Sequence, residues 1–190
     1  MKVGLFFGSF NPIHVGHLIL ANSMLAFGGL DETWFVVSPQ NPFKKKSNLL
    51  HEQDRLDMVR LATHDNDRLR ASDVEFRMPK PSYTVDTLVV LHEKYPQHDF
   101  RLIMGGDNLT HFKKWKNYEQ ILEYYGVLVF PRPNTPPTDL ADHPKIEIVN
   151  APMLDISATF IRKCIREESS IRYLVPDAVV ELIERKKFYV

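Results

Sequence analysis

Apolar positions along this chain follow two spacings that alternate with each other. Residues 2–7 form a short apolar run that ends at Gly8. Residues 15–27 then place apolar side chains at helical spacing until two glycines end the pattern. The start of the chain therefore predicts a strand, a turn and a helix.

The same alternation continues along the chain. Further strands are predicted at residues 33–37, 70–76, 100–104, 127–130 and 146–149, and further helices at 51–63, 84–95, 157–166 and 177–186, with short helical pieces between 107 and 124. Strands that alternate with helices are typical of a parallel sheet covered on both faces. We therefore expect an α/β fold, a Rossmann-like doubly wound parallel sheet with C-terminal helices. Ligands of such folds bind at the carboxyl ends of the strands.

Composition limits the class of protein. The 190 residues are 44% apolar and 25% charged, which predicts one compact domain over residues 1–190. Lys+Arg and Asp+Glu both number 24, so no excess charge attracts nucleic acid or an anionic membrane. The single cysteine, Cys164, cannot form an internal disulfide, and no apolar stretch approaches the ~20 residues that span a bilayer. We expect a cytoplasmic protein with no nucleic-acid or membrane partner, and a homo-oligomer stays open.

The first strand, turn and helix carry residues suited to phosphate. Residues 8–17 read GSFNPIHVGH, and the predicted helix start offers unpaired N–H groups and the positive end of its dipole. His14 and His17 are three residues apart, so both can donate to the same anion, and Gly16 leaves room for a nucleotide. The alternatives are a pair of surface histidines or half of a zinc site. No nearby cysteine or carboxylate completes a zinc tetrahedron, so we predict no metal held by protein ligands.

Four segments together resemble a known family. Residues 8–17 are similar to the nucleotidyltransferase signature in which a glycine turn, an Asp/Asn-Pro pair and HxGH bind ATP. The segments PSYTVDT at 81–87, MGGDNL at 104–109 and ISATFIR at 156–162 follow in order. With Trp115, they narrow the resemblance to the nicotinate-nucleotide adenylyltransferases. Asn11 stands where this family frequently has Asp.

The segment near the C-terminus also has a physical explanation. Ser157 precedes an apolar-periodic helix and is a good N-cap, and Arg162 lies where a guanidinium can bind phosphate oxygens. The alternative is an ordinary capped helix with a solvated arginine. The resemblance implies that the ATP site consists of Gly8, Ser9, His14, His17, Gly105, Asp107, Ser157, Thr159 and Arg162.

Two further positions have both a functional and a structural explanation. Asp107 follows a strand and two glycines, where an acid commonly binds ribose hydroxyls, although a helix cap explains it equally well. Trp115 lies among three lysines, which favours a platform for ring stacking over a core position, and the alternative is a half-buried tryptophan under a loop.

The resemblance also implies a substrate side of the site. The nicotinate ring would stack on Trp115, and backbone N–H groups near Thr84 and Lys116 would hold its carboxylate. Lys44, from a lysine run that is otherwise explained as a solvated loop, would neutralise the phosphate of the mononucleotide. The substrate-binding set is Lys44, Tyr83, Thr84, Trp115 and Lys116.

The activity implied by the resemblance is adenylyl transfer from MgATP to the 5′-phosphate of nicotinate mononucleotide in NAD biosynthesis, giving deamido-NAD and pyrophosphate. The attacking phosphate is already a nucleophile, so in-line displacement needs positioning and charge neutralisation, with His14, His17 and Arg162 as catalytic residues. Mg²⁺ would be carried by the ATP phosphates. The alternatives are a sibling adenylyltransferase that uses nicotinamide mononucleotide or phosphopantetheine, and a non-catalytic ATP-binding regulator.

Overall fold

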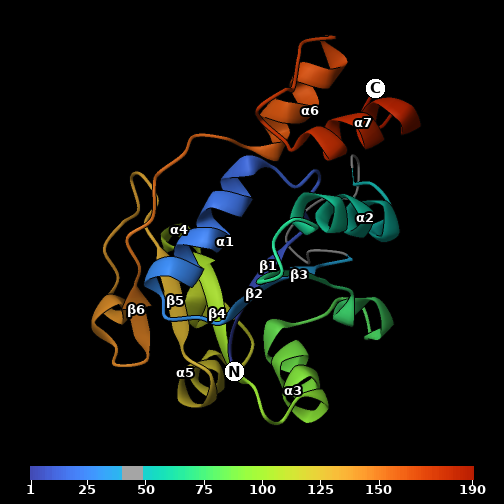
Figure 1. Cartoon of the computed structure of the whole chain (residues 1–190). Coiled ribbons are helices and arrows are strands. Elements are labelled where there is room, and N and C mark those ends of the chain that lie inside the picture. The colour runs from blue at the N-terminus through green and yellow to red at the C-terminus, as the bar shows by residue number, and fades with distance from the viewer. Residues whose placement is uncertain (40–48) are drawn as a thin grey trace.

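Six parallel strands form the centre of the molecule (Figure 1). The structure is a computed structural model that describes residues 1–39 and 49–190. The strands are β1 (Lys2–Gly8), β2 (Glu32–Val37), β3 (Leu69–Ser72), β4 (Asp99–Gly105), β5 (Val127–Phe130) and β6 (Ile146–Ile148). Their order in the sheet is β3-β2-β1-β4-β5-β6. The first three strands are therefore added in one direction from β1, and the chain then crosses to the other side of β1, where β4, β5 and β6 are added in the opposite direction. This order confirms the expected doubly wound sheet and places its switch point beside β1.

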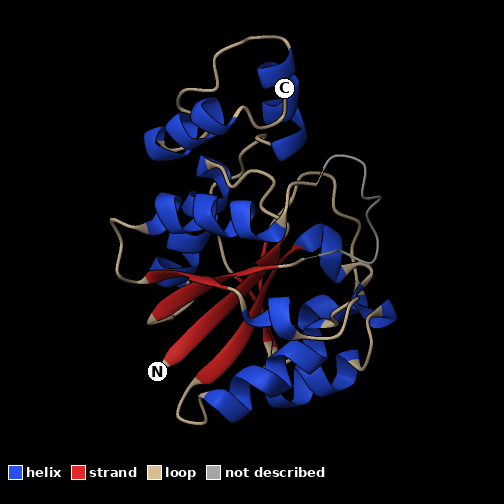
Figure 2. Ribbon diagram, turned by 90° about the vertical axis from the view of Figure 1, so that its right-hand side faces the viewer, coloured by secondary structure: helices blue, strands red, loops and turns tan. Residues whose placement is uncertain are grey.

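Helices cover both faces of the sheet, as Figure 2 shows. The helices are α1 (Val15–Phe27), α2 (Glu52–Thr63), α3 (Thr84–Lys94), α4 (Gly106–Leu109), α5 (Tyr118–Tyr124), α6 (Ala158–Arg166) and α7 (Asp177–Lys186). Apolar side chains of α1, α2, α6 and α7 join one core cluster, and those of α3 and α5 join the other. The expected C-terminal helices α6 and α7 lie beyond α2 in Figure 1.

Strand residues alternate between these two cores. In β1, Val3 and Leu5 are buried on the α3 side, whereas Phe6 is buried on the α1 side. The same alternation holds in β2, where Trp34 and Phe35 face opposite cores. Because both faces are covered, these strands read in the sequence as continuous apolar runs, which explains why their positions were predictable.

The strand predicted at residues 70–76 is wrong in its second half. The strand β3 ends at Ser72, and Val74–Arg77 form a 3₁₀ turn instead. The cause is Glu75, whose buried carboxylate accepts hydrogen bonds from Ser82 Oγ and Thr87 Oγ1, both at 2.8 Å. The turn directs this carboxylate toward the start of α3. The pattern of apolar residues gives no indication of this polar contact.

The helices of the molecule are short. None of those in residues 1–39 and 49–190 is long and apolar enough to cross a bilayer. Between residues 107 and 124 the expected short helical pieces are present as α4, a 3₁₀ turn at Phe112–Lys114 and α5.

Candidate active site

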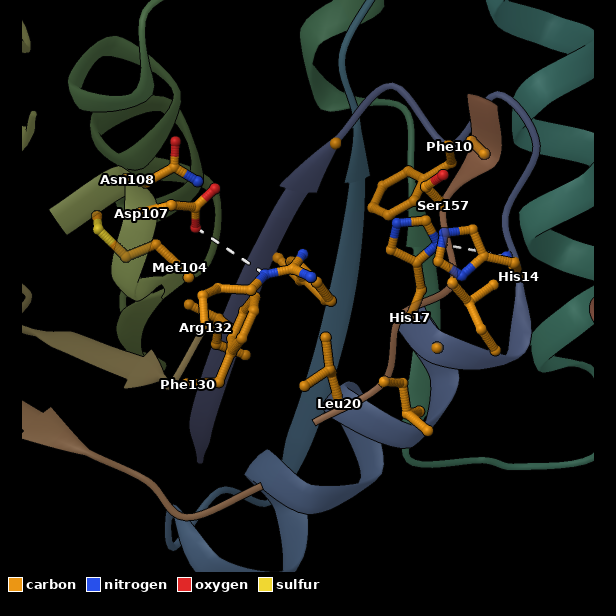
Figure 3. A pocket seen from close by; sticks show the side chains of 18 of the residues that line it. Phe10, His14, His17, Leu20, Met104, Asp107, Asn108, Phe130, Arg132 and Ser157 are labelled. Carbon is orange, nitrogen blue, oxygen red and sulfur yellow. Dashed lines mark hydrogen bonds and ion pairs between the residues drawn. The ribbon is translucent and has the colours of Figure 1, made fainter. Parts of the chain in front are cut away.

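A cavity of about 850 Å³ lies at the carboxyl ends of β1 and β4, at the switch point of the sheet. All the residues that the sequence assigned to ATP line it: Gly8, Ser9, His14, His17, Gly105, Asp107, Ser157, Thr159 and Arg162. Figure 3 shows His14, His17 and Ser157 on one side and Asp107 and Asn108 on the other, with Arg132 between them. Segments far apart in the sequence therefore meet in one hollow.

The turn after β1 is shaped by Phe10. This residue has a φ of 45°, in the left-handed region that non-glycine residues seldom adopt. A Cβ atom at Gly8 would come within 2.7 Å of the Phe10 ring. Gly8 therefore makes room for this ring, and the Phe10 ring in turn packs edge-on against His17 with ring centres 5.1 Å apart.

The two histidines stack at the start of α1. Their ring centres are 3.7 Å apart, and the backbone N–H of His14 donates to Nδ1 of His17 over 3.3 Å. A backbone N–H can only donate, so Nδ1 of His17 is the acceptor and Nε2 carries the proton of the neutral ring. The hydrogen bond therefore fixes His17 as an N–H donor through Nε2.

His14 is held as a neutral imidazole. Burial, together with the positive charge of Arg132, lowers its pKa from 6.5 to about 4. Its Nδ1 is buried and has no hydrogen-bond partner within the described part of the chain. A Cβ atom at Gly16 would lie 3.0 Å from that nitrogen, so Gly16 makes room for the His14 ring. This differs from the expectation that Gly16 makes room for the nucleotide itself.

Ser157 and Arg162 bring the start of α6 to the turn after β1. Ser157 Oγ accepts from the backbone N–H of Phe160 over 3.2 Å, which confirms the predicted N-cap. Arg162 donates from Nη1 to the Asn11 carbonyl over 2.7 Å and from Nη2 to Thr159 Oγ1 over 3.2 Å. The arginine thus lines the cavity and also ties α6 to the turn, so the alternative of a merely solvated side chain is wrong.

Asp107 and Arg132 form the opposite wall. The N-cap of α4 is Gly105, so the helix-cap explanation of Asp107 is wrong. The Asp107 Oδ1 atom lies 4.0 Å from Nε of Arg132, and Figure 3 marks this pair. The sequence analysis missed Arg132, which comes two residues after β5, at the start of a proline-rich segment at residues 131–144. Its place just beyond the carboxyl end of a strand was the signal that could have identified it.

The residues expected to bind the second substrate divide between two hollows. Trp115 lines the main cavity and packs half-buried against Phe112, with ring centres 5.3 Å apart, so packing and exposure to the cavity coexist. Tyr83 and Lys116 line a neighbouring hollow of about 630 Å³. The ammonium of Lys116 lies 2.8 and 3.0 Å from the Asp86 carboxylate oxygens and 4.9 Å from the centre of the Tyr83 ring.

Two members of the expected substrate set need separate mention. Thr84 is the first residue of α3, so its backbone N–H has no acceptor within the helix. Lys44 lies outside the described residues.

Comparisons with known proteins show which family the chain belongs to. The family model for cytidylyltransferase-like proteins matches residues 5–164. A Cytophaga hutchinsonii protein named "Probable nicotinate-nucleotide adenylyltransferase" is 59% identical over 189 residues, which cover 100% of this chain and 98% of that protein. A protein of the same name from Flavobacterium johnsoniae is 54% identical and matches 100% of this chain and 99% of its own length. The chain belongs to the nicotinate-nucleotide adenylyltransferases.

A solved structure of this adenylyltransferase class shares the fold. It is the Plasmodium falciparum nicotinic acid mononucleotide adenylyltransferase complexed with NaAD, which superposes with a TM-score of 0.82 at 20% identity. The match covers 99% of this chain and 97% of that one. The family resemblance drawn from the four sequence segments is therefore confirmed, and the architecture agrees with it.

A buried arginine of this adenylyltransferase, which the sequence analysis did not single out, holds the site together. Arg55 of α2 is fully buried and donates to the backbone carbonyls of Leu50, Ser9, Ser38 and Pro39 at 2.5–3.0 Å. These carbonyls belong to the turn after β1, the end of β2 and the segment before α2. Arg55 thus fixes the turn after β1 without itself lining the cavity. A single arginine in a helix gives no sequence signal for such a role.

The described residues contain no cluster of three or more His, Cys, Asp or Glu side chains that could hold a metal ion. The polar groups of this adenylyltransferase site are instead imidazoles, guanidiniums, hydroxyls, the side-chain amides of Asn11 and Asn108, and one carboxylate, Asp107. Apart from that carboxylate, these groups suit an anionic ligand.

Proposed function

We propose that this chain transfers the adenylyl group of ATP to the 5′-phosphate of nicotinate mononucleotide, giving deamido-NAD and pyrophosphate in NAD biosynthesis. The observation that carries the proposal is the stacked His14–His17 pair, which lines the same cavity as Arg162 and the half-buried Trp115. Relatives that match the whole chain carry the name of this activity.

The chemistry needs no covalent intermediate. A 5′-phosphate oxygen of the mononucleotide attacks the α-phosphorus of ATP, and the bond from that phosphorus to the bridging oxygen breaks as pyrophosphate leaves with its electron pair. Both partners are anions, so the protein supplies positioning and positive charge. The start of α1 is suited to this through the positive end of its dipole, although the backbone N–H groups of Val15 and His17 already donate to the carbonyls of Leu174 and His14.

The donors have assigned roles in this proposal. His17, with its proton fixed on Nε2, and His14 donate to oxygens of the α-phosphate and of the leaving group. Arg162 and Ser157 bind the outgoing pyrophosphate, with Thr159 beside the guanidinium. Arg132 adds a further positive charge from the opposite wall, and it lies close enough to His14 to lower the pKa of that imidazole. One such donor is typically worth ~10²–10³ in rate.

Two further parts complete the ATP side. Asp107, mostly exposed to the cavity and near Arg132, would accept hydrogen bonds from ribose hydroxyls. Mg²⁺ would enter as the MgATP complex, as part of the substrate and bound to its phosphates.

The acceptor side would recognise the acid rather than the amide. Trp115 offers a ring to stack on, and the backbone N–H groups near Thr84 and Lys116 offer donors only. A carboxylate satisfies donors, whereas a carboxamide must turn its own NH₂ toward one of them. Sites that hydrogen-bond a given group can reject the mismatched analogue by ~10⁴–10⁵.

The test is pyrophosphate release from MgATP with one acceptor at a time. Nicotinate mononucleotide should give a kcat/KM well above ~10² times that of nicotinamide mononucleotide, and phosphopantetheine should give none. Equal values for the two mononucleotides would mean that the ring is bound by stacking alone and would remove Thr84 and Lys116 from the site. ATP binding without pyrophosphate from any acceptor would instead identify a non-catalytic regulator.

A further inference from the structure

The chain turns back toward the active site after its last helix. Lys187, the C-cap residue that follows α7, has a φ of 51°, and Tyr189 has a φ of 68°, both in the left-handed region. The backbone N–H of Phe188 donates to the Ile183 carbonyl over 3.0 Å, which closes the helix end. Two non-glycine residues in this conformation show that the surroundings determine the path of the segment.

Tyr189 reaches the turn after β1. Its hydroxyl lies 2.8 Å from Oδ1 of Asn11, a residue 178 positions earlier. The backbone N–H of Leu50 donates to the same oxygen over 3.3 Å, so Oδ1 is the acceptor and the tyrosine hydroxyl is the donor. Burial raises the pKa of Tyr189 well above its ordinary value, which keeps the proton on this hydroxyl.

Asn11 connects Tyr189 to Arg162, which lines the cavity. It is 6% exposed, and its backbone carbonyl accepts from Nη1 of Arg162 over 2.7 Å. It also lies three residues before His14, in the turn that carries Phe10 with its positive φ. Movement of Asn11 would therefore move both the guanidinium and the backbone that leads to the histidine pair.

We propose that Tyr189 is a positioning residue for the ATP half of the site, which it orders by hydrogen bonding to Asn11 and thereby placing Arg162. This rests on the proposed function, because it assumes that the phosphates of ATP lie against Arg162 and His14. The hydroxyl itself does not line the cavity. A misplacement of about 1 Å in a catalytic group can cost ~10²-fold in rate, so a single buried hydroxyl can matter at this distance.

The rival explanation is that Tyr189 only fastens the end of the chain. Its ring packs against the core on the α1 side, and the neighbouring Lys186 ammonium lies 2.8 Å from Asp54 Oδ1 of α2. If that were the whole role, loss of the hydroxyl would lower the fraction of folded protein and would leave both KM values unchanged. The two explanations therefore differ in the KM for ATP.

The experiment compares Tyr189→Phe with Tyr124→Phe in the full chain. Tyr124 lies exposed on α5 and serves as the matched loss of one hydroxyl. For Tyr189→Phe we expect the KM for ATP to rise and kcat to fall, with kcat/KM for ATP about 10-fold below the parent protein. The KM for nicotinate mononucleotide should change less than about twofold, and the melting temperature by less than about 4 °C.

A second measurement separates this inference from the proposed function. Calorimetric binding of a non-hydrolysable ATP analogue needs no acceptor, and Tyr189→Phe should weaken it while Tyr124→Phe should not. In an Asn11→Ala background, Tyr189→Phe should have no further effect on analogue affinity, because the amide oxygen that accepts from the tyrosine hydroxyl is already absent.

Each outcome decides one question. An inactive parent protein that binds the analogue would overturn the proposed function alone. Unchanged analogue affinity and unchanged KM for ATP in Tyr189→Phe would overturn the role given to Tyr189, as would a loss of activity that follows the folded fraction.

Discussion

Acidification from pH 7 to pH 5 should weaken the folded state through His14. In the folded protein, burial and the charge of Arg132 lower the pKa of this imidazole from 6.5 to about 4. Between these values the unfolded chain binds a proton that the folded protein does not, so stability is highest above pH 6.5 and is lost as the pH falls toward 4. A difference of about 2.5 pKa units corresponds to about 3 kcal/mol, of which about 2 kcal/mol is lost between pH 7 and pH 5.

Urea unfolding at the two pH values measures this loss. Other groups also titrate in the range, so the useful quantity is the pH dependence of the parent protein minus that of His14→Gln. His111→Gln, at an exposed histidine, controls for the loss of an imidazole as such. The ring proton resonances of His14 should also show no titration above about pH 5. If His14→Gln loses as much stability on acidification as the parent protein, or if His14 titrates near 6.5, the argument from burial and Arg132 is wrong.

Three substitutions test other parts of the molecule. His17→Ala should lower kcat by at least ~10²-fold in the pyrophosphate assay while the melting temperature stays within a few degrees, and activity lost only in proportion to folded protein would assign His17 a structural role. Lys44→Ala should chiefly raise the KM for the mononucleotide, and a change confined to ATP would mean that the lysine serves the other phosphate. Arg55→Met should destabilise the protein by about 3 kcal/mol or more in urea unfolding, because buried carbonyls lose their donor, and a cost below about 1 kcal/mol would contradict that role.

Regular strands and helices were predictable because their pattern is local. The sheet is buried on both faces, so β5 appears as an uninterrupted apolar run, and α6 begins after a serine that caps it. Residues 70–76 failed for a tertiary reason. The conformation there depends on the hydroxyls of Ser82 and Thr87 that meet the Glu75 carboxylate, and no window of neighbouring residues contains that information.

The parts of the candidate site that belong to recognisable sequence motifs were predictable. The histidine pair, Asp107 and Arg162 belong to recognisable segments, and the structure brings them to one cavity. Arg55 and Tyr189 were missed because their partners are backbone carbonyls and one amide oxygen, far from them in the chain or in other elements. Such contacts leave no periodic trace in a single sequence.

The bond between Arg162 and the Asn11 carbonyl joins residues 151 positions apart, and this separation has a consequence for biosynthesis. A nascent chain that has emerged only as far as β6 already contains both histidines, yet it lacks Ser157, Thr159 and the guanidinium. Under the proposed function, such an intermediate cannot bind the triphosphate of ATP, even if its sheet has already formed. Nucleotide would bind only after α6 has docked and would then stabilise that finished state by mass action. Ligand-induced slowing of amide exchange should therefore appear together in the turn after β1 and in α6, as one cooperative unit.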